Sequence, residues 1–333
     1  MYRSRIIGSG AFAPPRVVTN AEMAKIVDTN DEWISSRTGI KERRLIDYEG
    51  HMATSEMAEP AARLALEKAG ITASDLDLIV IGTVTPDLRL PSAACLLQDK
   101  LGAKNAFAFD VVAACAGSIY GLSIADKFVQ QGSVKRALVI GAETLTTITN
   151  WKDRNTCVLF GDAAGAVILE RGALLTEKDA PGLIDTALYS DGSTWQHLYI
   201  PEGGSKKPPS HKLVDERLDR IVMNGREVYK IAVRSLVDAA NKILEKNGYT
   251  AKDVNLVVAH QANLRIIEGI SDRVGISLDQ FVINIDKYGN TSSASALVTF
   301  DEAARDGRMK PGSLVLMLAI GAGMTWGAAL YRA

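Results

Sequence analysis

The sequence predicts an α/β protein made of two duplicated halves, residues 1–172 and 173–333. One observation behind this prediction is that "LEKAGITASDLDLIVIGT", at 66–83, matches "LEKNGYTAKDVNLVVAHQ", at 244–261. Each copy has the pattern of a helix end, a glycine stop, a short link and a buried strand. A match between such distant segments indicates that the two halves repeat one structural unit.

A second pair of segments extends the repeat. "DKFVQQGSVKRALVIGAE", at 126–143, resembles "DEAARDGRMKPGSLVLMLAIGAG", at 301–323, with Gly132 aligned on Gly307. Helices that alternate with strands predict central sheets with helices on their faces. By analogy with other duplicated α/β proteins, we expect the layers in the order α-β-α-β-α.

Composition and charge argue against several classes of protein. The chain has 333 residues, of which 47% are hydrophobic and 23% charged, as is usual for a globular protein. Its net charge of −1 favours neither nucleic acid nor an anionic membrane as the main partner. The cysteines, Cys95, Cys115 and Cys157, lie far apart, so we expect no metal site and no disulfide framework. With an N-terminal apolar run too short for a signal peptide, this predicts a reducing, cytoplasmic compartment.

The C-terminal run "SLVLMLAIGAGMTWGAALYRA" is uncharged up to its penultimate residue and approaches the roughly 20 residues that span a bilayer. Gly321 and Gly323 interrupt it where a turn is expected. We therefore predict two buried strands, Leu314–Ala319 and Trp326–Tyr331, and no membrane segment.

Cys115 stands out because it lies between the apolar run "AFAFDVVAA" and an expected helix over Ala116–Gln131. A thiol at a helix N-terminus is exposed to partial positive charge, so we expect a lowered pKa and a reactive thiolate. Small neighbours leave room for a substrate. A single cysteine is, however, more often a buried core residue, so this interpretation needs partners for Cys115.

The repeat supplies two such partners. Cys115 corresponds to Asn290, in "DKYGNTSSASAL", and both precede a helix rich in small residues. His260 follows the strand at 256–259, and the carboxyl ends of strands are where α/β proteins bind ligands. Alone, His260 could be a core histidine and Asn290 a turn residue. Because the duplicated halves should meet around their strand ends, we expect Cys115, His260 and Asn290 to share one cavity.

Several motifs together resemble one enzyme family along the whole chain. They are "VVAACAGSIYGL", "FGDAAGAVIL", "VVAHQANLRII", "YGNTSSAS", "IGAGMTWGAAL" and, at 28–44, "DTNDEWISSRTGIKERR". The family is β-ketoacyl-[acyl-carrier-protein] synthase III, which has the thiolase fold. The resemblance implies decarboxylative condensation of an acyl-CoA primer with malonyl-acyl carrier protein, initiating type II fatty acid synthesis. It also implies a homodimer, no cofactor, and a catalytic triad at Cys115, His260 and Asn290.

The same resemblance implies further site residues. The backbone N–H groups of Cys115 and Ala322 would form an oxyanion hole. Ala322 replaces the middle glycine of the family's loop, and we expect it to have an ordinary backbone conformation. The positions for coenzyme A are Trp33, Arg37, Arg154 and Asn263.

A basic patch for the acidic carrier protein and a pocket for the acyl chain complete the expected site. The patch would comprise Lys230, Arg265 and Arg273, although Asp272 stands where the family often has a second basic residue. The pocket would comprise Val84, Ile320 and Leu90, the last reaching across a dimer interface. Aliphatic side chains where the family often has aromatic ones suggest acetyl-CoA with tolerance for longer or branched primers.

Other functions remain open at this stage. Relatives with the same fold make alkylquinolones, prime polyketides or transfer acyl groups. A more remote alternative is a Cys-His-Asn thioester hydrolase. A nicotinamide dehydrogenase is disfavoured because "GSG", at 8–10, lacks the G-x-G-x-x-G spacing.

Overall fold

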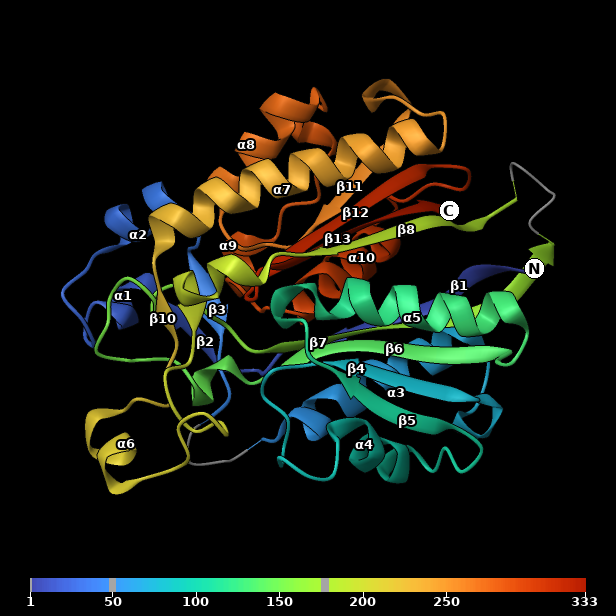
Figure 1. Cartoon of the computed structure of the whole chain (residues 1–333). Helices are drawn as coiled ribbons and strands as arrows, with labels where there is room; N and C mark the ends of the chain where they lie inside the picture. The colour runs from blue at the N-terminus through green and yellow to red at the C-terminus, as the bar shows by residue number, and fades with distance from the viewer. Residues whose placement is uncertain (1, 48–51, 175–179) are drawn as a thin grey trace.

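Residues 2–47, 52–174 and 180–333 are described by a computed structural model, in which two β-sheets lie on either side of a central pair of helices (Figure 1). The first sheet has the order β1-β7-β6-β4-β5. Its strands are β1 (Tyr2–Phe12), β4 (Leu78–Gly82), β5 (Phe107–Val111), β6 (Arg136–Glu143) and β7 (Ala163–Leu174). Strands β4, β5 and β6 run parallel, with β5 at the edge of the sheet, whereas β7 is antiparallel to both β1 and β6.

The second sheet has the order β11-β12-β13-β8. Its strands are β8 (Gly182–Ser190), β11 (Leu256–Ala259), β12 (Leu314–Gly321) and β13 (Thr325–Arg332). Read from β8, this order repeats that of the first sheet, and an isolated parallel bridge between Val257 and Phe281 takes the place of the fifth strand. The two C-terminal strands predicted from the sequence are confirmed. In the described part of the chain, no helix combines the length and apolarity needed to cross a bilayer.

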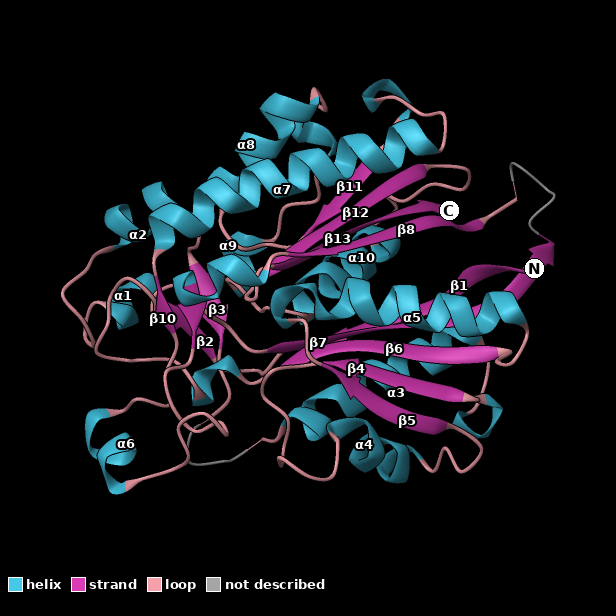
Figure 2. Cartoon of the chain, viewed as in Figure 1, coloured by secondary structure: helices cyan, strands magenta, loops and turns pink. Residues whose placement is uncertain are grey.

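Helices lie in three layers, one on the outer face of each sheet and one between the two sheets (Figure 2). The outer layer on the first sheet has α3 (Thr54–Ala69) and α4 (Ala93–Leu101), the middle layer α5 (Gly117–Gln131) and α10 (Ala294–Arg305), and the outer layer on the second sheet α7 (Gly225–Lys246) and α8 (Leu264–Val274). The predicted order α-β-α-β-α is therefore confirmed.

The middle helices are fixed by apolar contacts with both sheets. Ile119 and Leu122 of α5 are fully buried in one cluster with Val139 of β6 and Met317 of β12. Burying such a side chain stabilises the fold by about 1.5–3 kcal/mol. The predicted helix over 116–131 is confirmed, with α5 starting one residue later.

Glycines allow the middle helices to approach the sheets closely. A Cβ atom at Gly82, the last residue of β4, would lie 2.5 Å from the carbonyl carbon of Gly117. A Cβ atom at Gly141, in β6, would lie 2.1 Å from the carbonyl oxygen of Ser293. The starts of α5 and α10 therefore lie against the first sheet, near the ends of these strands.

Shorter elements gather beside the two sheets (Figure 1, left). They are β2 (Val17–Thr19), α1 (Asn20–Met23), α2 (Asp31–Thr38), β3 (Glu42–Arg44), β9 (Leu198–Tyr199), α6 (His211–Glu216), β10 (Val222–Met223) and α9 (Ile285–Tyr288). Most contribute to a separate apolar cluster that also contains Leu145, just after β6. This part of the molecule provides much of the wall of the cavity described next.

Candidate active site

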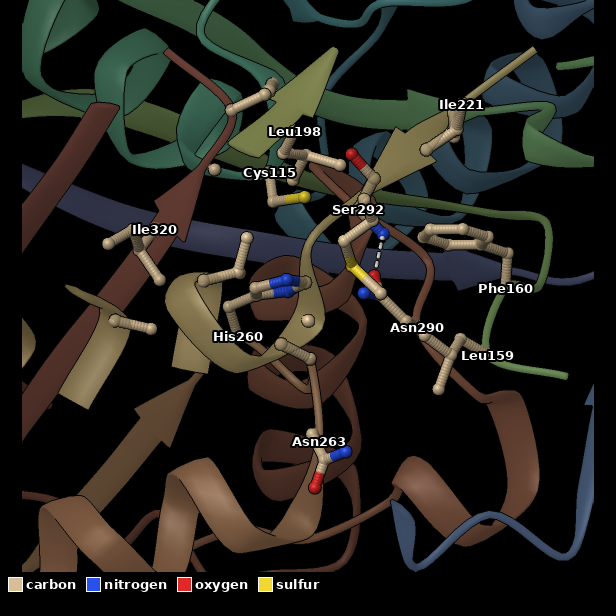
Figure 3. Close-up of a pocket in the computed structure, with 18 of the residues that line it drawn as sticks. Cys115, Leu159, Phe160, Leu198, Ile221, His260, Asn263, Asn290, Ser292 and Ile320 are labelled. Atoms are coloured by element: carbon tan, nitrogen blue, oxygen red, sulfur yellow. Dashed lines mark hydrogen bonds between the residues drawn. The ribbon is translucent and has the colours of Figure 1, made fainter. Parts of the chain in front are cut away.

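Cys115, His260 and Asn290 line one cavity of about 350 Å³ (Figure 3). The three side chains come from separate segments of the chain, one from the first half and two from the second, that meet where the two halves join. The rest of the wall is mainly apolar. The structure thus brings together the three residues that the repeat selected.

The backbone around Cys115 is held in an unusual conformation. A 3₁₀ turn at Ala114–Ala116 joins β5 to α5, and Ala114 has a positive φ of 44°. A Cβ atom at position 321 would lie 2.3 Å from the Cys115 backbone nitrogen, so only glycine fits there. The Thr325 hydroxyl donates to the carbonyl of Ala113 at 2.8 Å, which ties the start of β13 to the segment before Cys115.

The expected lowering of the Cys115 pKa is wrong. Burial raises the pKa of the thiol to about 12, and the nearby Glu143 adds to the increase, while a hydrogen bond from Ser292 opposes it. The 3₁₀ turn places Cys115 two residues before Gly117, the first residue of α5. Desolvation of the thiolate is the largest cause acting on the thiol and outweighs those that lower its pKa.

His260 directly follows β11, as predicted, and its backbone N–H donates to Leu318 of β12 at 2.7 Å. Burial lowers the pKa of its imidazole to about 3, so the ring is neutral at physiological pH. In the described part of the chain, its buried Nδ1 has no hydrogen-bond partner. A neutral imidazole carries a single N–H, which can donate one hydrogen bond into the cavity from Nε2.

Asn290 is held by hydrogen bonds on both its backbone and its side chain. Its backbone N–H donates to Leu159 at 2.8 Å, and its carbonyl accepts from Gly161 at 2.9 Å. The backbone N–H of Ser292 donates to the side-chain Oδ1 at 2.9 Å (Figure 3). Because Oδ1 is engaged, the side-chain NH₂ remains to donate to a bound molecule.

Two polar residues beside the triad were missed by the sequence analysis, Ser292 and Glu143. Glu143 ends β6 and is fully buried, which raises the pKa of its carboxyl group. Its Oε2 accepts from the Thr83 hydroxyl, the Val84 backbone N–H and the Thr85 hydroxyl at 3.1, 3.0 and 2.8 Å, and its Oε1 accepts from the Ser292 hydroxyl at 3.0 Å. The available signal was an isolated acidic residue at the end of an apolar strand.

Three of the residues expected to bind coenzyme A lie together. The guanidinium groups of Arg37 and Arg154 lie over the Trp33 ring, 4.8 and 4.9 Å from its centroid. Asn263 lines the cavity, and its Oδ1 accepts from the backbone N–H of Arg265 as the N-cap of α8. Arg265 also donates to the carbonyl of Ser36 in α2 at 3.0 Å, so α2 and α8 are adjacent.

The three expected carrier-protein residues are all exposed, on the two packed helices α7 and α8. Lys230 forms an ion pair with Glu227 at 2.7 Å. Arg265 and Arg273 lie near opposite ends of α8. The structure therefore places them on one helical layer at the surface.

The expected acyl-pocket residues divide into two groups. Val84 and Ile320 line the cavity, whereas Leu90 is 85% exposed and does not line it within its own chain. Ala322 also lines the cavity and, among the described residues, is not one of those with a positive φ, as expected. Further apolar lining residues were not identified from the sequence: Leu145, Leu159, Phe160, Leu198, Ile221 and Met324.

Among the described residues, no group of three or more His, Cys, Asp or Glu side chains could hold a metal ion.

Comparison with known proteins identifies the family. Residues 109–192 match the family described as 3-oxoacyl-[acyl-carrier-protein (ACP)] synthase III, and residues 244–333 match its C-terminal part. A beta-ketoacyl-[acyl-carrier-protein] synthase III from Caldanaerobacter subterraneus subsp. tengcongensis is 47% identical over 327 residues, covering 98% of this chain and 97% of that protein. This chain belongs to the β-ketoacyl-[acyl-carrier-protein] synthase III family. The resemblance drawn from its motifs is confirmed.

Other β-ketoacyl-[acyl-carrier-protein] synthase III relatives agree. The protein from Xanthomonas campestris pv. campestris (strain 8004) is 49% identical over 329 residues, which is 99% of this chain and 98% of that protein. The crystal structure of 3-oxoacyl-[acyl-carrier-protein] synthase III from Aquifex aeolicus VF5 aligns with a TM-score of 0.90 at 44% identity, covering 99% and 100% of the two chains. The thiolase fold and the assignment as an acyltransferase follow.

A priming beta-ketosynthase from the R1128 polyketide biosynthetic pathway is also similar. It aligns with a TM-score of 0.90 at 35% identity, covering 99% of this chain and 97% of that chain. The identities to the synthase III relatives from C. subterraneus, X. campestris and A. aeolicus are higher. These findings do not favour the polyketide, alkylquinolone or hydrolase alternatives.

Proposed function

We propose that this protein condenses an acyl-CoA primer with malonyl-acyl carrier protein, giving 3-oxoacyl-acyl carrier protein, CoA and CO₂. This reaction initiates type II fatty acid synthesis. The observation that carries the proposal is the single cavity shared by a thiol, a neutral imidazole and a carboxamide whose NH₂ is free to donate. The first half of the chain, 1–172, supplies Cys115, and the second, 173–333, supplies His260 and Asn290.

In the first half-reaction, Cys115 attacks the acyl-CoA thioester, the acyl group moves to the enzyme and CoA leaves. A covalent intermediate divides one difficult reaction into two easier ones. The oxyanion formed during attack would accept from the backbone N–H groups of Cys115 and Ala322. The close contact between Gly321 and the Cys115 nitrogen supports this assignment, because it brings the two backbone segments together.

In the second half-reaction, malonyl-acyl carrier protein loses CO₂, and the resulting carbanion attacks the acyl group on Cys115. Negative charge develops on the malonyl thioester oxygen as CO₂ leaves. His260 Nε2–H and Asn290 Nδ2–H would donate to that oxygen, each stabilising the transition state by about 3 kcal/mol. The low pKa of buried His260 supports this role, because the imidazole keeps the same protonation state at physiological pH.

Substrate recognition is proposed around the cavity. The adenine of CoA would stack at Trp33, Arg37 and Arg154, with Asn263 hydrogen-bonding the pantetheine arm. The guanidinium groups of Arg37 and Arg154 already lie over the Trp33 ring, so an adenine would stack beside them or take the place of one of them.

The acidic carrier protein would dock on the exposed residues of α7 and α8, namely Lys230, Arg265 and Arg273. Charges at the rim of such an interface act mainly on the association rate. The reaction requires no cofactor in this proposal, and the protein would act in the cytoplasm.

We propose a homodimer in which Leu90 of each subunit reaches the acyl pocket of its partner. The exposed apolar side chains at one edge of the first sheet support this, since Phe107 and Val112 are 47% and 79% exposed. Val84, Ile320 and the partner's Leu90 would then favour acetyl-CoA with tolerance for short or branched primers.

Mass spectrometry of the intact protein after exposure to C2–C8 acyl-CoAs tests this function. We expect stable acylation of Cys115, fastest for short primers, and none in Cys115→Ala. Adding malonyl-acyl carrier protein should convert the acyl group into a 3-oxoacyl product. Rapid release of free fatty acid without an acceptor would instead favour a thioester hydrolase.

A further inference from the structure

Glu143 is a fully buried carboxyl group beside the nucleophile, and the triad chemistry gives it no task. Three donors from the loop that follows β4 hold its Oε2. Its Oε1 faces the other way and accepts from the Ser292 hydroxyl at 3.0 Å. A carboxyl group without a charged partner is costly to bury, so its place next to the cavity calls for an explanation.

Ser292 connects this carboxyl group to the triad. Its backbone N–H donates to Asn290 Oδ1 at 2.9 Å, and its hydroxyl lies within hydrogen-bonding reach of the Cys115 thiol. Ser292 also has a positive φ of 49°, which is unfavourable for a residue with a side chain. Such strain persists where the surrounding contacts demand that position, and it concentrates at functional sites.

The acylation of Cys115 needs a proton acceptor. The thiol keeps its proton at neutral pH because burial raises its pKa to about 12. His260 is a poor acceptor because burial disfavours its charged form and lowers its pKa to about 3. Glu143 is different, since burial raises its pKa and so makes it a stronger base than an exposed carboxylate.

We propose that Glu143 accepts the thiol proton of Cys115 through the hydroxyl of Ser292 during acylation, an inference that rests on the proposed function. The Cys115 S–H bond breaks as a Ser292 O–H bond forms, and the original Ser292 O–H bond breaks as an O–H bond forms on Glu143 Oε1. The electron pair left on sulfur attacks the acyl carbon. When the bond to CoA breaks, the CoA thiolate takes the proton back by the reverse route, so the protonation of the protein is restored.

The surroundings of Glu143 suit this relay. Thr83, Val84 and Thr85 on one side and Ser292 on the other contribute no charged group. The titratable groups that face it across the site are Cys115 and, on the opposite wall of the cavity, His260. The negative charge of Glu143 opposes a thiolate at Cys115, and this repulsion disappears once the carboxyl group takes the proton. Glu143 acts through Ser292 and is therefore a positioning residue that does not touch the substrate.

Single-turnover acylation by acetyl-CoA, followed by intact-mass measurement, tests the relay in Glu143→Gln. A general base typically contributes 10²–10⁴-fold, so we expect acylation at pH 7 to slow by about a hundredfold. The fall in rate that protonation of Glu143 causes at acid pH should also disappear. The direction of the change in acylation rate is decisive. Removing the negative charge of Glu143 alone would favour the Cys115 thiolate and speed acylation, whereas loss of the proton acceptor would slow it. An unchanged or faster rate at pH 7 would overturn the relay. A slower rate with an unaltered pH profile would point to a structural role instead and would also overturn it.

Ser292→Ala provides a second test that leaves the backbone N–H to Asn290 in place. It should slow acylation to a similar extent, and combining it with Glu143→Gln should add little, because both remove one pathway. Fully additive losses would contradict the relay. Asp126→Asn, which alters a buried carboxyl group of α5 hydrogen-bonded to Ser4, is the matched control and should acylate at the unaltered rate.

The outcomes separate the relay from the function on which it rests. If the unaltered protein is acylated at Cys115 and the two variants are acylated equally fast, only the relay fails. If the unaltered protein is not acylated by any acyl-CoA, the proposed function fails and the relay fails with it.

Discussion

The two halves of the chain share a structural hydrogen bond but differ in their reactive groups. Asp126 on α5 and Asp301 on α10 occupy corresponding places in the repeat. Each accepts from a serine of β1, Ser4 at 2.6 Å and Ser9 at 2.8 Å. Both middle helices are thus hydrogen-bonded to β1 through a serine–aspartate pair.

At the ends of the strands the correspondence breaks down. Cys115 corresponds to Asn290, and His260 corresponds to Gly82. Gly82 lets α5 approach β4, whereas His260 places an imidazole in the cavity. The serine–aspartate contacts that position the middle helices are therefore present in both halves. The polar side chains of the cavity, Cys115, His260 and Asn290, each occur in one half alone.

The largest expected effect concerns Asn290, which stands in the second half where the first half has Cys115. Asn290→Ala removes the carboxamide donor and should slow condensation from the acyl-enzyme by about a hundredfold or more. Acylation of Cys115 should be much less affected, because in our proposal that step uses the backbone N–H groups of Cys115 and Ala322 as its oxyanion hole. The two half-reactions are measured separately by single-turnover kinetics. Equal losses in both would contradict a specific role in decarboxylation.

A pH experiment tests whether His260, which stands where the first half has Gly82, is a buried and neutral imidazole. Because burial lowers the pKa of His260 to about 3, the unfolded chain binds a proton below about pH 6.5 and the native state does not. This residue should therefore reduce the free energy of unfolding by about 2 kcal/mol between pH 7 and pH 5. The measurement is urea unfolding at both pH values for the unaltered protein and His260→Gln, so that other groups cancel. An identical pH dependence in the two proteins would contradict a buried, neutral imidazole.

The shared serine–aspartate contacts predict matched, smaller effects. Ser4→Ala and Ser9→Ala should each lower the free energy of unfolding by about 1 kcal/mol, since both leave a buried carboxylate with one donor fewer. Neither should change acylation or condensation rates. The check is denaturant unfolding alongside activity, and a large activity loss in only one variant would show that the two contacts are not equivalent.

The smallest expected effect concerns the surface of the second half. Arg265→Glu should slow the reaction with malonyl-acyl carrier protein roughly two- to fivefold at low salt, and transacylation from acyl-CoA should stay unchanged. Lys242→Glu, at an exposed position of α7 closer to its C-terminal end, serves as the control. Equal losses with both substrates would exclude a carrier-protein role for Arg265.

The sequence was sufficient to predict the architecture and the cavity shared by Cys115, His260 and Asn290, because both follow from patterns along the chain and from the repeat. Apolar strands, glycine stops and a repeat locate the sheets, and a polar residue after a buried strand marks His260. Asn290 follows from its alignment with Cys115. These inferences need only the order of residues along the chain.

What the sequence could not show depends on distances between segments. The pKa of Cys115 is raised because of how densely the folded chain surrounds the thiol, which no local pattern reveals. Glu143 and Ser292 are 149 residues apart, and no sequence pattern indicates that the two side chains are hydrogen-bonded. The lining residues Leu198 and Ile221 lie in or next to two-residue strands, too short to give a periodic signal.

A pulse-chase experiment on the acyl-enzyme tests the central claim most directly. Protein loaded with isotopically labelled acetyl-CoA is freed of CoA, mapped by peptide mass spectrometry and then mixed with malonyl-acyl carrier protein. We predict one label per chain on Cys115, followed by its complete transfer into 3-oxobutanoyl-acyl carrier protein with release of CO₂. Label on any other residue, or label on Cys115 that the carrier protein cannot remove, would contradict the account.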